Sequence, residues 1–186
     1  MFESLFERDL DRGERIVWTG QPDARRMLTP ADWFLIPFSL LWGGFALYWE
    51  ATVLGWTGSP PAPPAFAVFG APFVVLGLYF MIGRFFYQGW VKRNTYYALT
   101  NRRALIVRHL RGRSVDAIIL DSLPSISTSV RPDGSGTIVF GPTTPFDALY
   151  GNTGLSFFRK GVYTPAFYDI PDVQVVAAQI DGLRQA

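Results

Sequence analysis

The sequence predicts a membrane α-helical hairpin of two transmembrane helices, followed by a mainly β domain that a C-terminal helix caps. Two uncharged apolar runs, residues 33–49 and 65–83, predict the hairpin. From Thr95 onward the apolar residues tend to recur at every second position, which is typical of strands. The last apolar residues, from Val173, return to a helical spacing and predict the closing helix.

The first ten residues predict a short amphipathic helix. In FESLFERDL, the side chains of Phe2, Leu5, Phe6 and Leu10 fall on one face, and acidic residues dominate the other. Helices that lie on a membrane surface prefer Lys and Arg on their polar face. We therefore expect this helix to pack against the cytoplasmic domain or against a partner.

Each apolar run is close to the ~20 residues that a helix needs to cross a hydrocarbon core of roughly 30 Å. The first run reads WFLIPFSLLWGGFALYW and the second reads AFAVFGAPFVVLGLYFMIG. A pair of buried core helices is the alternative, but a core helix normally keeps a polar stripe and these runs are apolar on every face. The composition also favours a membrane protein, because only 17% of the 186 residues are charged, against about 25% in soluble domains.

The connection between the runs, residues 55–65, is rich in proline and uncharged, so the two helices should form a hairpin. Lys and Arg lie before the first run and after the second, and positive residues close to membrane-spanning helices stay in the cytoplasm. We therefore expect a multi-pass protein with both termini in the cytoplasm. Its parts are an N-terminal cytoplasmic segment (1–30), the transmembrane hairpin (31–87) and a cytoplasmic domain (88–186).

The cytoplasmic domain should consist of successive antiparallel strands separated by turns. A less regular stretch, residues 141–161, should be a loop with one short strand. After it, PDVQVVAAQIDGL places Val173, Val176 and Ile180 on the buried face of a helix. The expected strands are TYYALT, RALIVRHL, SVDAIIL, SISTSV, TIVF and PAFYDI.

Taken in order, several segments resemble the bacterial pleckstrin-homology-like membrane proteins. They are GERIVWTGQP (13–22), the apolar hairpin, YALTNRRALIV (97–107), GSGTIVF (134–140) and FYDIPDVQVVAAQI (167–180). The resemblance implies a pleckstrin-homology-like barrel of two bent antiparallel sheets with a helix at one end, held in the bacterial inner (cell) membrane. It implies no catalytic residues.

No pattern in the sequence points to catalysis. The absence of cysteine excludes thiolate nucleophiles and zinc–thiolate sites. His109 is the only histidine, and it lies on an expected strand beside Arg108. The sequence has no G-x-S-x-G, Walker or H-E-x-x-H motif. We therefore expect a protein that is not an enzyme and that holds no cofactor and no metal.

A basic run without a single acid, Arg84 to Arg113, follows the second apolar run. Near a bilayer it would attract anionic headgroups by about 1 kcal/mol per cation. The alternative is a topology signal combined with solvated strand faces. Nucleic-acid binding is not expected, because a recognition helix or basic residues interleaved with exposed aromatics are lacking. The candidate contacts with anionic lipid are Lys92, Arg93, Arg102, Arg103, Arg111 and Arg113.

Together these features predict a non-enzymatic integral membrane protein that presents a binding or assembly domain at the cytoplasmic membrane face. Its partners would be membrane lipids with anionic headgroups, another membrane protein or further copies of the chain. One alternative is a homo-oligomeric membrane scaffold in which sheet edges pair between subunits. Another is an accessory subunit of a transporter or of an envelope enzyme.

Overall fold

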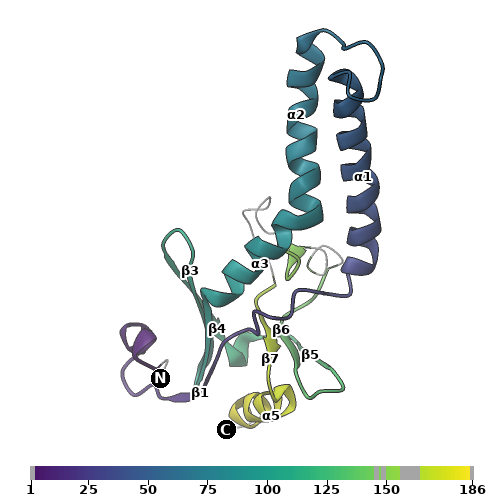
Figure 1. Cartoon of the computed structure of the whole chain (residues 1–186). Helices are drawn as coiled ribbons and strands as arrows, with labels where there is room; N and C mark the ends of the chain where they lie inside the picture. The colour runs from purple at the N-terminus through teal and green to yellow at the C-terminus, as the bar shows by residue number, and fades with distance from the viewer. Residues whose placement is uncertain (1–2, 145–146, 148–149, 156–163, 185–186) are drawn as a thin grey trace.

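The computed structural model describes residues 3–144, 147, 150–155 and 164–184. A helical hairpin rises away from two β-sheets (Figure 1). It consists of α1 (Asp32–Val53) and α2 (Pro64–Leu78), and the second helix continues through a π-helical segment (Tyr79–Gly83) into α3 (Arg84–Arg93). By length and composition, the helices Asp32–Val53 and Pro64–Arg93 can each cross a membrane.

The two helices of the hairpin approach closely at a pair of glycines. A Cβ atom on Gly77 would lie 2.9 Å from the Cα of Gly43, so a larger residue there would push the helices apart. The second helix changes direction where α2 gives way to α3 (Figure 1), at the π-helical segment. A single π-helical turn is a common cause of such a bend, and here it directs α3 across the sheets.

The strands form two antiparallel sheets. In the described residues no backbone ladder joins them, so the barrel is not closed. The strand order is β1-β2-β3-β4 in the first sheet and β5-β6-β7 in the second. The strands are β1 (Ile16–Gly20), β2 (Thr95–Thr100), β3 (Arg103–His109), β4 (Arg113–Ile119), β5 (Ile126–Val130), β6 (Gly136–Phe140) and β7 (Ala166–Ile170).

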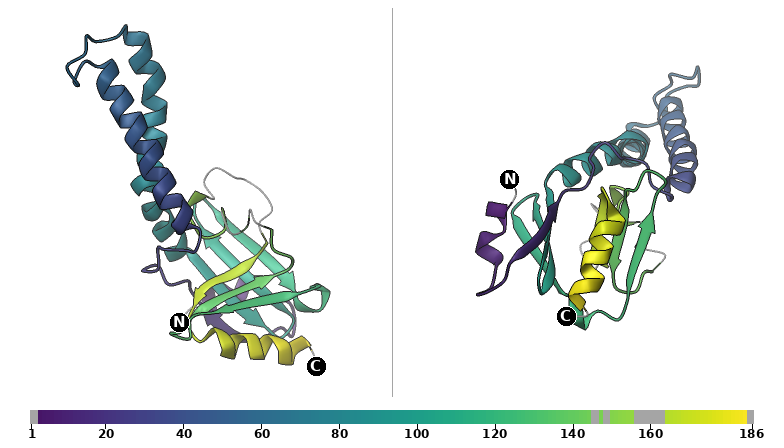
Figure 2. Two further views of the ribbon diagram at one scale, coloured as in Figure 1. Left: turned by 90° about the vertical axis from the view of Figure 1, so that its right-hand side faces the viewer. Right: turned by 90° about the horizontal axis from the view of Figure 1, so that it is seen from below.

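The core lies between the sheets, and the C-terminal helix α5 (Val173–Arg184) covers one end of it (Figure 2). The predicted inward face of this helix is confirmed, because Val173, Val176 and Ile180 are all at most 1% exposed. On the sheets, Phe167 stacks on Tyr97 with ring centroids 4.6 Å apart. The six strands expected after the hairpin are also present, and no bound differs from the expected one by more than one residue.

The segment before the hairpin contributes a strand that the sequence analysis did not predict. Strand β1 pairs antiparallel with β2, from Ile16 opposite Thr100 to Gly20 opposite Tyr97, with an irregularity of register after Ile16. That irregularity interrupts the two-residue alternation by which a strand is recognised in a sequence. The first sheet is therefore built from chain segments that precede and follow the hairpin in the sequence.

The first residues form two 3₁₀ turns, Glu3–Leu5 and Glu7–Asp9, in place of the expected amphipathic helix. They pack against the β domain, because Phe6 is fully buried on the outer face of the first sheet beside Leu105 and Val107. Packing against this domain is thus confirmed, although the local structure differs. A run of seven residues is too short to hold an α-helix without such contacts.

Glu14 fastens this segment to the turn between β2 and β3. Its two carboxylate oxygens accept hydrogen bonds from Arg103 Nε at 2.9 Å and Nη2 at 2.8 Å, and one also accepts from Thr100 Oγ1 at 2.6 Å. The hydrogen bond from Arg103 lowers the pKa of Glu14 to about 2. The side chain is therefore charged and paired at neutral pH.

The strand expected within residues 141–161 is not seen in the part of that stretch that the structure describes, namely residues 141–144, 147 and 150–155. Residues 145–146, 148–149 and 156–161 lie outside the described residues.

Candidate functional site

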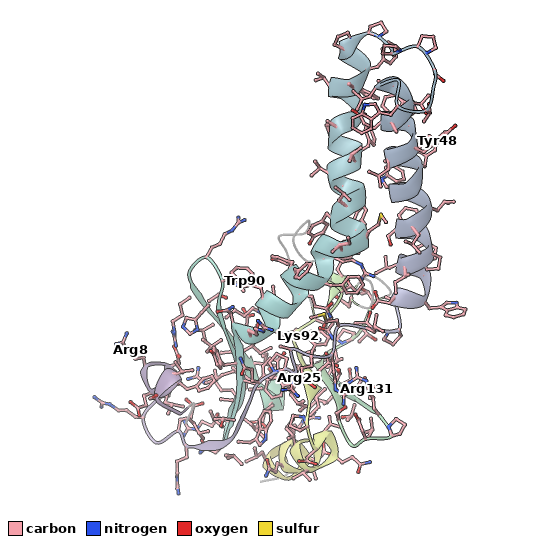
Figure 3. The ribbon with its side chains drawn as sticks, in the orientation of Figure 1. Arg8, Arg25, Tyr48, Trp90, Lys92 and Arg131 are labelled. Atoms are coloured by element: carbon pink, nitrogen blue, oxygen red, sulfur yellow. The ribbon has the colours of Figure 1, made fainter. Side chains whose placement is uncertain are left out.

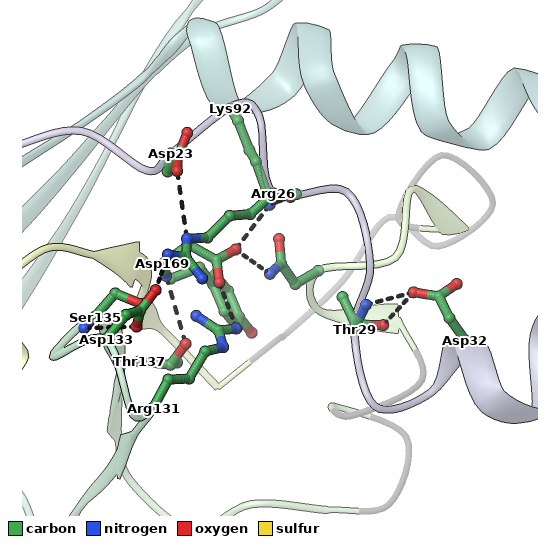
Figure 4. A network of polar contacts seen from close by, with 12 residues as sticks. Asp23, Arg26, Thr29, Asp32, Lys92, Arg131, Asp133, Ser135, Thr137 and Asp169 are labelled. Carbon is green, nitrogen blue, oxygen red and sulfur yellow. Dashed lines mark hydrogen bonds and ion pairs between the residues drawn. The ribbon is translucent and has the colours of Figure 1, made fainter.

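A buried cluster of charges joins α3 to the sheets and to the chain before the hairpin (Figure 4). At its centre the carboxylate of Asp169 accepts from Lys92 Nζ at 2.7 Å and from Asn152 Nδ2 at 2.6 Å, and it pairs with Arg131 Nη2 at 2.6 Å. Lys92 also donates to the carbonyl oxygen of Arg26. We call Arg26, Lys92, Arg131, Asp133, Asn152 and Asp169 the polar junction.

The local backbone at Asp169 turns its carboxylate into this cluster. Asp169 is 2% exposed and has φ 50°, in the left-handed region that Asp tolerates better than most residues. The register of β6 and β7 is irregular between Gly136 and Ile138, opposite this part of β7. The carbonyl oxygen of Asp169 accepts from the backbone N–H of Asp23 at 3.1 Å, so β7 also holds the chain that leads to α1.

Electrostatics keep the central carboxyl charged. Burial by itself acts to raise the pKa of Asp169, but the positive charge of Lys92 and the hydrogen bonds from Lys92, Asn152 and Arg131 outweigh it, and the net pKa is lowered. A buried carboxylate is stable only when it is paired in this way. Removing one partner should therefore cost more than removing an exposed ion pair.

Within the polar junction, Arg26 contacts the turn between β5 and β6 through Asp133. Its guanidinium pairs with Asp133 and, at 3.3 Å, with Asp23. Hydrogen bonds from Ser135 and from Arg26 lower the pKa of Asp133 to about 2. These groups are partly exposed, so their pairing contributes less to stability than that of Asp169.

A second ion pair lies at the foot of the hairpin. Arg84 Nη2 is 2.5 Å from Asp32 Oδ1, and both side chains are at most 4% exposed. Asp32 Oδ2 accepts from the Thr29 hydroxyl at 2.8 Å, just before α1 begins. Arg84 Nε donates to the carbonyl oxygen of Phe80 at 3.0 Å, next to the bend of the helix. The first residue of α1 and the first residue of α3 are thereby held together.

The loop before β7 completes the contact between hairpin and domain. The Tyr79 hydroxyl donates to the carbonyl oxygen of Gly154 at 2.6 Å, and Arg84 Nη1 donates to that of Thr153 at 3.4 Å. Gly154 has φ 80°, and a Cβ there would collide with the backbone of Arg84. Glycine is therefore required where this loop meets the hairpin.

A pocket of about 190 Å³ lies beside the polar junction, between the last turn of α3 and the two sheets. Its lining includes Lys92, Tyr97, Arg108 and Tyr168. Within the described ranges, no group of three or more His, Asp or Glu could hold a metal ion. The chemistry that the junction offers is ion pairing: it fixes the position of α3, and with it the hairpin, relative to both sheets.

The structure does not bring the six candidate lipid-contact residues together. Lys92 is 3% exposed and paired with Asp169, so its expected contact with headgroups does not fit the structure. Arg103 is held by Glu14, and Arg113 pairs with Asp9. Arg93, Arg102 and Arg111 are exposed, but they lie on different elements. Successive turns of an antiparallel sheet lie at opposite ends, so Arg102 is far from the turn that carries Arg111.

Sequence reasoning missed Asp169, Asp32 and Arg84. A helical projection of RFFYQGWVKR could have signalled Arg84 and Lys92, because these residues and Gln88 recur every four positions and share one face of α3. No comparable local pattern marks Asp169, whose partners are 17 to 77 residues away in the chain.

No protein-family model, no curated protein and no solved structure matches the chain. The functional interpretation therefore depends on the geometry of the hairpin, the polar junction and the surfaces around them.

Proposed function

We propose that the chain is an integral membrane protein of the bacterial inner membrane, with a two-helix hairpin that crosses the bilayer and both termini in the cytoplasm. We propose that its β domain is a non-enzymatic, pleckstrin-homology-like module for binding or assembly. Two facing antiparallel sheets with a helix across one end support the second part (Figure 2). The exposed apolar hairpin supports the first.

The hairpin has the surface of a lipid-facing element. Trp33 is 90% exposed, Leu41 76% and Val68 75%, and the hairpin stands clear of the sheets (Figure 1). A patch of this size on a soluble protein would cause aggregation. The 22 residues of α1 extend about 33 Å at 1.5 Å per residue, which suffices for a hydrocarbon core of roughly 30 Å.

The observation that carries the proposal is the rigid link between hairpin and domain. The helix Pro64–Arg93 runs unbroken from the apolar hairpin to the sheets, and buried ion pairs of Arg84 and Lys92 fix its last three turns. A flexible tether would only keep the domain near the bilayer. This link also fixes which face of the domain meets the bilayer, so even weak contacts there occur at high effective concentration.

Single-cysteine labelling tests the topology, because the chain has no native cysteine. Ser59→Cys lies in the exposed connection between α1 and α2, and Ser125→Cys lies on the exposed surface of the β domain. In spheroplasts, an impermeant maleimide should label Ser59→Cys at once and Ser125→Cys only after lysis. The reverse pattern would overturn the orientation, and equal labelling of both before lysis would overturn the spanning hairpin.

A homo-oligomeric scaffold is the second candidate, and strand β4 favours it. This strand forms one edge of the first sheet, and Ile119 at its end is 58% exposed. An exposed edge is a template for pairing with another copy. Cross-linking of a cysteine introduced at Ser114 on β4, in reconstituted full-length protein, should give dimers if this scaffold forms and only monomers if it does not.

A further inference from the structure

The polarity of α3 is the reverse of that expected for a helix lying on a domain in water. Its polar residues Arg84, Gln88 and Lys92 face the protein and are 1%, 3% and 3% exposed. Phe86 is 73% exposed and Trp90 is 41% exposed. Figure 3 shows Trp90 on the side of α3 opposite Lys92. In water, an amphipathic helix turns its apolar side inward.

The buried side of α3 explains why the polar residues face inward. Arg84 pairs with Asp32, Lys92 pairs with Asp169, and Gln88 Nε2 donates to the carbonyl oxygen of Asn152. This polar side is therefore committed to the domain. The rotation of α3 about its axis is fixed, and its apolar side must face outward.

The exposed apolar side of α3 is continuous with the apolar surface of the hairpin. Ile82, in the π-helical segment, is 53% exposed, and Phe86 and Trp90 follow at intervals of four residues. An isolated exposed aromatic residue would need no explanation. Here, however, the exposed residues form a stripe that extends the apolar surface of the hairpin into the next helix. This continuity indicates that lipid contacts α3 as well as the hairpin.

Basic residues lie at the end of this apolar stripe that is farther from the hairpin. Arg93 is exposed and lies seven residues after Phe86, on the same side of α3. The turn between β3 and β4, which carries the exposed Arg111, lies beside the end of α3, because His109 N–H donates to the carbonyl oxygen of Asn94 at 2.8 Å. The order from aliphatic to aromatic to basic is that of a bilayer from its core to its headgroups.

We propose that the outer side of α3, formed by Phe86, Trp90 and Arg93, lies in the interface between headgroups and acyl chains of the cytoplasmic leaflet. The bend at the π-helical segment lets α3 leave the spanning direction and lie along the surface (Figure 1). This inference rests on the proposed function and names the partner of the domain: the lipid surface itself. Lys92 takes no part in it, because its ammonium group is committed to Asp169.

Site-directed spin labelling of the full-length chain tests this placement. Four single-cysteine variants, Leu41→Cys, Phe86→Cys, Trp90→Cys and Gln174→Cys, each carry a nitroxide at an exposed position. The protein is reconstituted into vesicles of phosphatidylcholine and phosphatidylglycerol. Collisions with oxygen, which enriches in lipid, are then compared with collisions with a water-soluble nickel chelate.

The label at residue 86 should show an oxygen-to-nickel ratio several-fold above that at residue 174 on α5, and below that at residue 41 on the hairpin. The label at residue 90 should lie between those at 86 and 174. If the label at residue 86 were as accessible to nickel as the label at residue 174, while the label at residue 41 remained lipid-exposed, this inference would be overturned and the proposed function would stand. A nickel-accessible label at residue 41 would overturn both.

A second copy of the chain on this side of α3 would give a different result. The labels at residues 86 and 90 would then be shielded from oxygen and nickel alike, and spin–spin broadening would appear in fully labelled samples. Either observation would refute the lipid assignment. Replacing Arg93 by Gln should lower the oxygen-to-nickel ratio at residue 90 in vesicles with phosphatidylglycerol, with little change in pure phosphatidylcholine. An equal change in both lipids would refute the part assigned to charge.

Discussion

Replacing Asp169 by asparagine should lower the free energy of unfolding by about 3 to 5 kcal/mol, because removal of one partner leaves a buried charge uncompensated. Asparagine has nearly the same volume and tolerates the left-handed backbone at this position, so the loss reports the charge. In the variant, the 3% exposed ammonium of Lys92 would keep only neutral oxygens, including the carbonyl of Arg26. Lys92→Met should cost less, about 2 kcal/mol, since Asp169 keeps Arg131 and Asn152.

Thermal unfolding of the full-length chain in mild detergent, followed by circular dichroism, measures both effects. For a chain of this length the Asp169→Asn variant should melt about 10 °C lower than the parent. The control is Arg26→Gln, which breaks the partly exposed pair with Asp133 and should lower the melting temperature much less. The double variant of Lys92 and Asp169 should lose less than the sum of the single losses. If Asp169→Asn had the same melting temperature as Arg26→Gln, the buried pairing of Asp169 with Lys92 would not be what holds α3 to the sheets.

Three further predictions concern the β domain. The hydrogen bond from Arg103 lowers the pKa of Glu14 to about 2. The stabilisation from this ion pair is therefore complete above about pH 5 and is lost as the pH falls toward 2. The melting temperatures of Glu14→Gln and the parent should differ at pH 7 and converge near pH 2. Val176→Asp buries an unpaired carboxylate at a 1% exposed position and should abolish cooperative melting, whereas Val175→Asp, at 58% exposure, should change stability by less than about 0.5 kcal/mol. Phe6→Ala should detach the N-terminal turns from the sheet, and trypsin should then cleave that segment faster than in the parent; unchanged cleavage would contradict the buried position of Phe6.

Local periodicity and composition were sufficient to predict α1, α2, α5 and most of the strands. The four-residue spacing of Val176 and Ile180, for example, reflects the one side of α5 that the core accepts. Strand β1 could not be found in this way. Its pairing with β2 has an irregular register, and its stability comes from a strand some 80 residues later in the chain.

The basic run shows a second kind of limit. The local sequence shows that Lys92 and Arg93 follow the second apolar run. It cannot show that Asp169 pairs with Lys92 and not with Arg93. Arg103 is similar, because its partner Glu14 lies before the hairpin. Ion pairs formed across long sequence separations decide which cations remain exposed, and no local pattern records them.

The position of β1 has a consequence for biosynthesis. Ile16–Gly20 leaves the ribosome before either helix of the hairpin, but its partner Thr95–Thr100 is made only after both. The first sheet therefore cannot form completely until the hairpin has been synthesised, and synthesis of the hairpin separates the two halves of one folding unit. During that interval the N-terminal strand has no partner and must be kept from pairing elsewhere. A gene fragment that starts after the hairpin would encode a sheet with an unpaired β2 edge, a template for aggregation.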